Sequence, residues 1–223
     1  MRTHIFDIDG TLTKSGNDLW FLIMQELCEP KAFRALVLDW EAKSKTYESS
    51  YTLLVGTLKL LRNIENAEEK IFNTAKKLTH GLIDKKLVPN KALIALRQSI
   101  HACDLIVLST ANYFEAAKGF TEALLERNLI SQFEYNQLVI LATNTDWGKY
   151  SVECFNMGDV KIHTFYRFLQ QKNYPLKVPD KVFIDDPQFN DASLANESLE
   201  VVVVDNLKNR DYIRNTGFER VFW

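Results

Sequence analysis

Cysteine, glycine and long apolar runs are all scarce in this chain of 223 residues. Cys28, Cys103 and Cys154 lie far apart and form no CxxC pair, which argues against a disulfide framework or a structural zinc site. No apolar run approaches the length of a membrane span, and acidic residues stand where a secretory signal would need its apolar core. We therefore expect a cytoplasmic protein with free thiols and no contact with a membrane.

An excess of charge of one sign is also lacking. Lys and Arg number 27, Asp and Glu number 29, and the net charge is -2. No basic run indicates nucleic-acid binding. The 46% hydrophobic content is ordinary for a globular protein and can fill a sizeable core. The sequence gives no indication of the oligomeric state.

Short runs rich in Val, Ile and Leu predict strands, and most of them are apolar on both faces, as in a covered parallel sheet. They lie at 3–6, 105–109, 138–142, 181–185, 201–204 and 220–223. Helical patterns at 91–102, 113–127 and 160–171 alternate with them. This alternation predicts an α/β fold with a doubly wound, Rossmann-like parallel sheet.

The segment after the first strand breaks the alternation. Helical patterns at 18–28, 31–44, 50–62 and 67–79 follow one another with no convincing strand between them. Pro30 suits a first helical position, Asn66 with Glu69 resembles a capping box, and Gly81 suits the end of the last helix. We therefore predict a core of residues 1–14 and 89–223 with an inserted helical cap at 15–88. Its hinges would lie near 14–17 and 87–90.

Three aromatic residues of the predicted cap leave two interpretations open. Trp20, Trp40 and Tyr47 could line a substrate pocket or pack the interior of the helical insert. The second interpretation is favoured, because large aromatic side chains tend to be buried.

Polar residues follow several of the predicted strands, at the edge where open α/β sheets bind their ligands. Asp7 and Asp9 stand in FDIDGTLT directly after the first strand. Two carboxylates held together there repel each other, which favours a bound Mg²⁺. Ser109 and Thr110 follow the second strand, and an acid pair follows the strand at 181–185.

This set suits phosphoryl transfer. Asp7 could attack phosphorus, and Asp9 could protonate the leaving alkoxide and then activate water. Ser109 or Thr110, at a helix N-terminus, could donate hydrogen bonds to the phosphoryl oxygens. Lys161, near the start of its helix, would neutralise negative charge. Gly10 allows a tight turn beside the two acids.

With these residues the chain resembles a haloacid dehalogenase (HAD) superfamily hydrolase of the phosphoserine-phosphatase-like subgroup with a helical C1-type cap, over nearly its full length. FDIDGTLT is similar to the first family motif. The resemblance implies that Asp7 is the nucleophile and Asp9 the acid/base, with Gly10 and Thr11 beside the phosphate. It also implies that the Asp7 side chain and the Asp9 backbone carbonyl bind Mg²⁺.

The other motifs of the family resemble three later stretches. LIVLSTAN implies Ser109, with Thr110, for phosphate binding. GKYSVECFNMGDVKIHTFYRFL implies Lys161, and VFIDDPQFNDASLA implies Asp186 as a metal ligand supported by Asp185 and Asn190.

Two departures from the subgroup pattern leave assignments open. Asp185-Asp186 replaces the usual Gly-Asp, so either carboxylate could be the ligand, and Asn190 and Asp191 compete for the next position. Thr110 stands where a small residue usually follows the phosphate-binding Ser or Thr.

The sequence thus predicts a Mg²⁺-dependent phosphomonoester hydrolase that forms an aspartyl-phosphate and acts on a small phosphorylated metabolite. A phosphotransferase or phosphomutase on the same fold is the alternative within enzymes. A signalling switch or a non-catalytic phosphate-binding protein is the alternative outside them. A dehalogenase is disfavoured, because Asp9 suits phosphate-ester chemistry. The four histidines show no ligand spacing, and no nucleophile-elbow sequence supports a serine or cysteine hydrolase.

Overall fold

A seven-stranded sheet with the order β4-β3-β2-β1-β5-β6-β7 forms the centre of the computed structural model, which describes residues 1–43, 46–206, 209–210, 216 and 218–222. The strands are β1 (Thr3–Phe6), β2 (Leu105–Tyr113), β3 (Leu138–Asp146), β4 (Ser151–Cys154), β5 (Lys181–Ile184), β6 (Glu200–Val204) and β7 (Glu219–Val221). Neighbouring strands are parallel except β3 and β4, which form an antiparallel pair. The predicted α/β fold is confirmed, and the last residue of the predicted strand at 220–223 lies outside the described residues.

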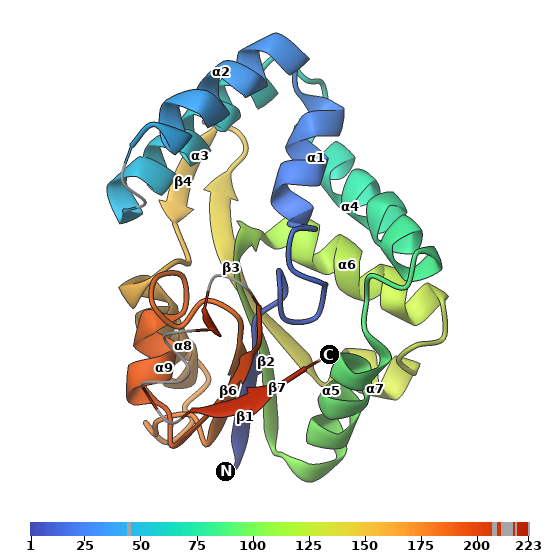
Figure 1. The fold of residues 1–223 in the computed structure, drawn as a ribbon, viewed down its shortest axis with the longest axis vertical. Coiled ribbons are helices and arrows are strands. Elements are labelled where there is room, and N and C mark those ends of the chain that lie inside the picture. Colours follow the sequence, from blue (N-terminus) through green and yellow to red (C-terminus); the bar gives the residue numbers. More distant parts are fainter. Residues whose placement is uncertain (44–45, 207–208, 211–215, 217, 223) are drawn as a thin grey trace.

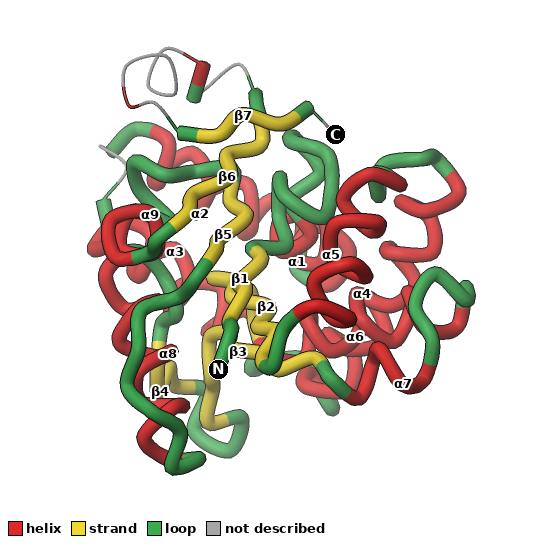
Figure 2. Tube along the Cα trace, turned by 90° about the horizontal axis from the view of Figure 1, so that it is seen from below, coloured by secondary structure: helices red, strands yellow, loops and turns green. Residues whose placement is uncertain are grey.

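Helices cover both faces of the sheet (Figure 2). They are α5 (Asn90–Ala102), α6 (Phe114–Glu126), α7 (Gln132–Asn136), α8 (Asp159–Gln171) and α9 (Ala192–Glu197). Ile162, Phe165 and Leu169 of α8 belong to one hydrophobic cluster with the inner residues of β1 and β5. The other face packs against α5 and α6 through a second, larger cluster. Among the described residues, every helix is too short or too polar to cross a membrane.

Four helices stand between β1 and α5, as the sequence predicts: α1 (Leu19–Leu27), α2 (Pro30–Glu41), α3 (Tyr47–Leu61) and α4 (Ala67–Asp84). The insert packs against the rest of the protein at two places (Figure 1). Helix α4 packs along α6 and α1, whereas α2 pairs with α3, and α3 contacts β4. The predicted division at 15 and 88 stays a prediction, but α4 is clearly packed against the sheet-covering helix α6.

The helix ends confirm one prediction from the sequence and correct two. Pro30 is the first residue of α2. Asn66 lies before α4 with a left-handed backbone (φ 53°) and makes no side-chain cap, because a capping side chain needs an extended backbone. Gly81 does not end α4, which continues to Asp84 and buries Leu82. Lys86, at φ 57°, takes the left-handed position after the helix instead.

The β3–β4 hairpin and the short helices α7 and α9 were not predicted. The apolar run of β3 stops near residue 142, but the strand continues to Asp146 because it pairs with β4. Pairing with β4 across a short turn supplies those strand residues, and a search for apolar runs does not show it.

Candidate active site

Asp7 lies directly after β1 and is fixed by the sheet. Its backbone N–H donates to the Phe183 carbonyl of β5 at 3.0 Å, so the ladder continues one residue past the strand. The residue is 5% exposed, and its Oδ1 accepts a hydrogen bond from Lys161 Nζ at 2.8 Å. Burial raises the pKa of Asp7, while the Lys161 ammonium opposes that rise. Asp7 is therefore an oriented and charge-compensated carboxylate.

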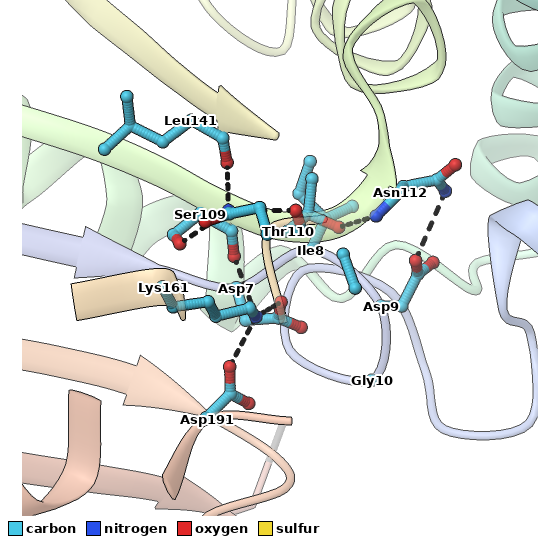
Figure 3. A network of polar contacts seen from close by, with 12 residues as sticks. Asp7, Ile8, Asp9, Gly10, Ser109, Thr110, Asn112, Leu141, Lys161 and Asp191 are labelled. Atoms are coloured by element: carbon cyan, nitrogen blue, oxygen red, sulfur yellow. Dashed lines mark hydrogen bonds and ion pairs between the residues drawn. The ribbon is translucent and has the colours of Figure 1, made fainter. Parts of the chain in front are cut away.

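Lys161 is completely buried in the first turn of α8. Its ammonium donates to Asp7, to Asp191 Oδ1 at 2.5 Å and to the Ser109 carbonyl at 3.2 Å (Figure 3). Burial alone would lower the pKa of Lys161, but the carboxylates of Asp191 and Asp7 raise it above its ordinary value. The lysine therefore remains a cation, and the structure places it in contact with Asp7.

Three carboxylates converge beside this lysine. Oxygens of Asp7, Asp185 and Asp191 lie within 4.8 Å of one another. Among the described residues, this is the one group of three acidic, histidine or cysteine side chains close enough together to hold a metal ion. Burial, followed by the charges of Asp7 and Asp191, raises the pKa of Asp185 well above its ordinary value. Carboxylate oxygens are the donors that Mg²⁺ prefers, and this excess of negative charge would be relieved by a divalent cation. The cluster therefore fits the predicted metal.

The composition of this cluster bears on the ambiguity that the sequence left open. Of the residues predicted as metal ligands, Asp7 and Asp185 belong to the cluster, whereas the side chains of Asp9 and Asp186 do not. Asp186 nevertheless lines the same cavity as Asp7 and Asp185. Asp191, which competed with Asn190 in the sequence, is the partner of Lys161.

Gly10 and two asparagines hold Asp185 in place. A Cβ on Gly10 would lie 2.1 Å from Asp185 Oδ2, and the glycine has φ +80°, so only glycine lets the two loops approach. Asn206 Nδ2 donates to Asp185 Oδ2 at 3.3 Å, and Asn209 Nδ2 donates to the Asp185 carbonyl at 2.6 Å. Neither asparagine was predicted from the sequence, since they follow β6 in no recognisable motif.

Asp9 is held by groups from the insert and from the sheet. Its Oδ1 accepts the N–H of Leu19, the first residue of α1, at 2.8 Å, and its Oδ2 faces Asn112 Nδ2 at 3.4 Å (Figure 3). Burial raises the pKa of Asp9 well above its ordinary value, and the nearby charges of Asp18 and Asp7 raise it further. A carboxyl group whose pKa is raised suits the role of a proton donor. Asn112 was not predicted as a site residue.

Residues 109 and 110 do not lie at a helix N-terminus, contrary to the sequence prediction. Strand β2 continues to Tyr113, which pairs with Thr143 across a register shift, and α6 begins at Phe114. Both residues are 1% exposed, but Thr110 lines the cavity at Asp7 and Ser109 does not. The structure therefore brings Thr110 to the cavity, with the small Ala111 after it.

Asn156, which was not predicted as a site residue, fixes this part of β2 against β3. Its Nδ2 donates to the Ser109 hydroxyl at 3.3 Å, to the Thr110 carbonyl at 3.0 Å and to the Leu141 carbonyl at 2.8 Å. Its side chain is completely buried. Asn156 lies in the sequence stretch that contains Lys161, so that stretch supports the site at two points.

Two further predicted residues differ in their placement. Asn190 lines the cavity, and its Oδ1 is buried with no hydrogen-bond partner among the described residues. The Thr11 hydroxyl is likewise buried and unpartnered among them, but Thr11 does not line the cavity. The two positions therefore do not share a role.

A cavity of about 650 Å³ joins these groups to the helical insert. Asp7, Asp9, Thr110 and Lys161 line it from the sheet side. Trp20 and Trp40 line it from α1 and α2, which supports the pocket interpretation for these two, while Tyr47 is not part of the lining. The site thus has a polar, reactive part at the strand ends and an apolar part beneath the insert.

The sheet order and the helices inserted after β1 define a Rossmann-like α/β fold with a helical insert. No family model matches the sequence, and no curated protein matches it. Among solved structures, a protein of unknown function from Bordetella pertussis Tohama I has a TM-score of 0.76 at 16% identity, covering 99% of this chain and 98% of that one.

Two further solved structures with a similar fold are phosphatases. A phospho-aspartyl intermediate analogue of phosphoserine phosphatase has a TM-score of 0.55 at 15% identity, covering 91% of this chain and 86% of that one. A HAD phosphatase from Thermococcus onnurineus has a TM-score of 0.51 at 13% identity, covering 99% and 100%. At these identities the likeness shows the fold, and at that level it confirms the resemblance found in the sequence.

Proposed function

We propose that this protein hydrolyses a small phosphomonoester, with Asp7 as the nucleophile. The observation that carries the proposal is the position of Asp7 in the cavity, with its carboxylate 2.8 Å from an ammonium that is completely buried. A nucleophilic carboxylate beside a fixed cation suits attack on a phosphate dianion, because the cation offsets the repulsion between them. The fold shared with HAD phosphatases supports the same reaction class.

In the first half of the proposed reaction, an Asp7 oxygen forms a bond to phosphorus and the bond from phosphorus to the substrate oxygen breaks. The leaving oxygen takes its proton from Asp9, because burial raises the pKa of this residue and so favours its protonated form. Thr110, which lines the cavity, would donate a hydrogen bond to a phosphoryl oxygen. Thr110 thus takes the role that the resemblance gave to Ser109.

In the second half, water attacks the phosphorus of the aspartyl-phosphate. Asp9, now a carboxylate, accepts a proton from that water, and the bond between phosphorus and Asp7 breaks to release inorganic phosphate. Leu19 N–H and Asn112 hold the Asp9 carboxylate in the same position for both halves. At the end of the cycle Asp9 has regained its proton and Asp7 is again free of the phosphoryl group.

Asp7 and Asp185 are the predicted metal ligands that belong to the cluster, and their side chains would hold Mg²⁺. When bound, Mg²⁺ would supply positive charge that offsets the repulsion between the phosphate and the carboxylates.

Hydrolysis of p-nitrophenyl phosphate with and without EDTA tests the proposal. We expect turnover with Mg²⁺, loss of it in EDTA, and none in Asp7→Asn that retains a cooperative melting transition. Reaction in ¹⁸O-labelled water should place the label in inorganic phosphate, which separates hydrolysis from transfer to a second alcohol. Full turnover by a folded Asp7→Asn variant would show that the nucleophile lies elsewhere.

A further inference from the structure

The part of the cavity beneath the insert is lined mainly by aromatic and aliphatic side chains. Trp20 and Phe21 come from α1, Trp40 from α2, Leu54 from α3, and Phe155 follows β4. A phosphoryl group placed at Asp7 and Thr110 would leave the rest of its substrate to occupy this part of the cavity. The chemistry of these side chains therefore bears on the leaving group.

The rings are packed against one another and are held in place. Phe21 lies between the two indoles, with ring centroids 5.1 Å from Trp20 and 5.9 Å from Trp40. Phe155 is supported by Tyr47, at a centroid distance of 5.3 Å. Rings that are fixed before binding lose little conformational entropy when a ligand packs against them. They suit a flat apolar group, which gains from stacked or edge-to-face contacts.

The charged groups near these rings are negative. Asp18 and Glu41 line the same part of the cavity, and among the described lining residues Lys161 has the one positively charged side chain. That ammonium is already bound by Asp7 and Asp191. A carboxylate on the leaving group would lose water and meet like charge there.

From these walls we propose that the preferred substrate is a phosphate monoester of an alcohol that carries an aromatic ring and no negative charge outside the phosphate. This inference rests on the proposed phosphatase function and names its substrate class. It differs from what phosphoserine would need, because phosphoserine carries a carboxylate.

Four alkyl phosphates test the inference: 2-phenylethyl phosphate, propyl phosphate, O-phosphoserine and phosphocholine. All four release an aliphatic alcohol, so differences in kcat/KM report mainly on binding of the leaving group. We expect 2-phenylethyl phosphate to exceed propyl phosphate by about tenfold or more, since a buried phenyl ring removes a large apolar area from water. O-phosphoserine should fall below propyl phosphate. If kcat/KM for O-phosphoserine or phosphocholine equals or exceeds that for 2-phenylethyl phosphate, the inference is overturned and the phosphatase function remains intact.

Variants of Trp40 test the contact itself. Trp40→Leu should lower kcat/KM for 2-phenylethyl phosphate by about 3- to 10-fold and leave propyl phosphate within about twofold. Trp40→Phe keeps a ring and should retain most of the preference. Tyr174→Leu, which removes an aromatic residue that is 43% exposed and not part of the lining, is the matched control. An unchanged preference in Trp40→Leu would refute the contact, and no hydrolysis of any phosphomonoester by the unmodified protein would refute the proposed function itself.

Discussion

Replacing Lys161 with methionine should destabilise the fold and abolish turnover through the loss of one charge. Methionine is unbranched and of similar length, so the space inside the site stays largely filled. Asp7 and Asp191 would then be left at 5% and 0% exposure without their cation. Removing one partner of a buried ion pair costs about 3–5 kcal/mol of unfolding free energy. For a chain of this size, that corresponds to a fall in Tm of about 6–20 °C.

A second substitution separates stability from chemistry. Asp191→Asn added to Lys161→Met removes one of the two stranded carboxylates, so the double variant should regain at least about 1 kcal/mol relative to Lys161→Met. Turnover should not return, because the charge beside Asp7 is still missing. We expect both variants to lose about 10²- to 10³-fold or more in kcat, the scale seen when a preorganised charge or donor is removed.

Thermal unfolding followed by circular dichroism, together with phosphate release, measures both effects. Lys172→Met, on an exposed residue that follows the last turn of the same helix, serves as the control and should change neither. A Tm for Lys161→Met within about 2 °C of the unmodified protein, or turnover within tenfold of it, would refute the assignment of Lys161 as the buried cation of the site.

Three further predictions concern other positions. Gly10→Ala should lose Mg²⁺-dependent turnover and at least about 1–2 kcal/mol of stability, seen in phosphate release and urea unfolding, because its Cβ would meet Asp185 and its φ is +80°. Thr110→Val should lower kcat by about 10²-fold, more than Ser109→Ala does, in a direct comparison of initial rates. Burial would raise the pKa of Glu134, but hydrogen bonds from its neighbours lower it from 4.5 to about 2. The ionised Glu134 therefore stabilises the fold above about pH 4.5, and this stabilisation is lost as the pH falls toward 2. The Tm difference between Glu134→Gln and the unmodified protein should shrink over the same pH range and vanish near pH 2.

The chemistry of the site could be predicted because topology concentrates it. The carboxyl ends of parallel strands meet at one edge, so acids after β1 and β5 must approach each other once the sheet is recognised. Lys161 could be assigned to the same place because α8 begins at that edge. Asp7, Lys161 and Asp185 are therefore close together in the structure, although 154 residues separate the first two.

The supporting amides could not be predicted, for a physical reason. Asn112, Asn156, Asn206 and Asn209 each act through hydrogen bonds to residues that are distant in sequence or to backbone carbonyls. Asparagine is common in turns, so its presence there carries no signal for such a contact. The end of β2 was mistaken for a similar reason, since Tyr113 pairs across a register shift that no local pattern shows.

The arrangement of the insert limits how it could gate the cavity. Asp9 is bound to the first residue of α1, and the Lys14 N–H donates to the Leu87 carbonyl at 2.8 Å, joining the two predicted hinges. Moving the whole insert would strain both bonds and the packing of α4 on α6. Helix α2 is different, because Phe33 is its one buried residue. Segments with few buried contacts open at the lowest free energy, so motion centred on α2 would open the aromatic part of the cavity while Asp9 and the more deeply buried α3 stay in position.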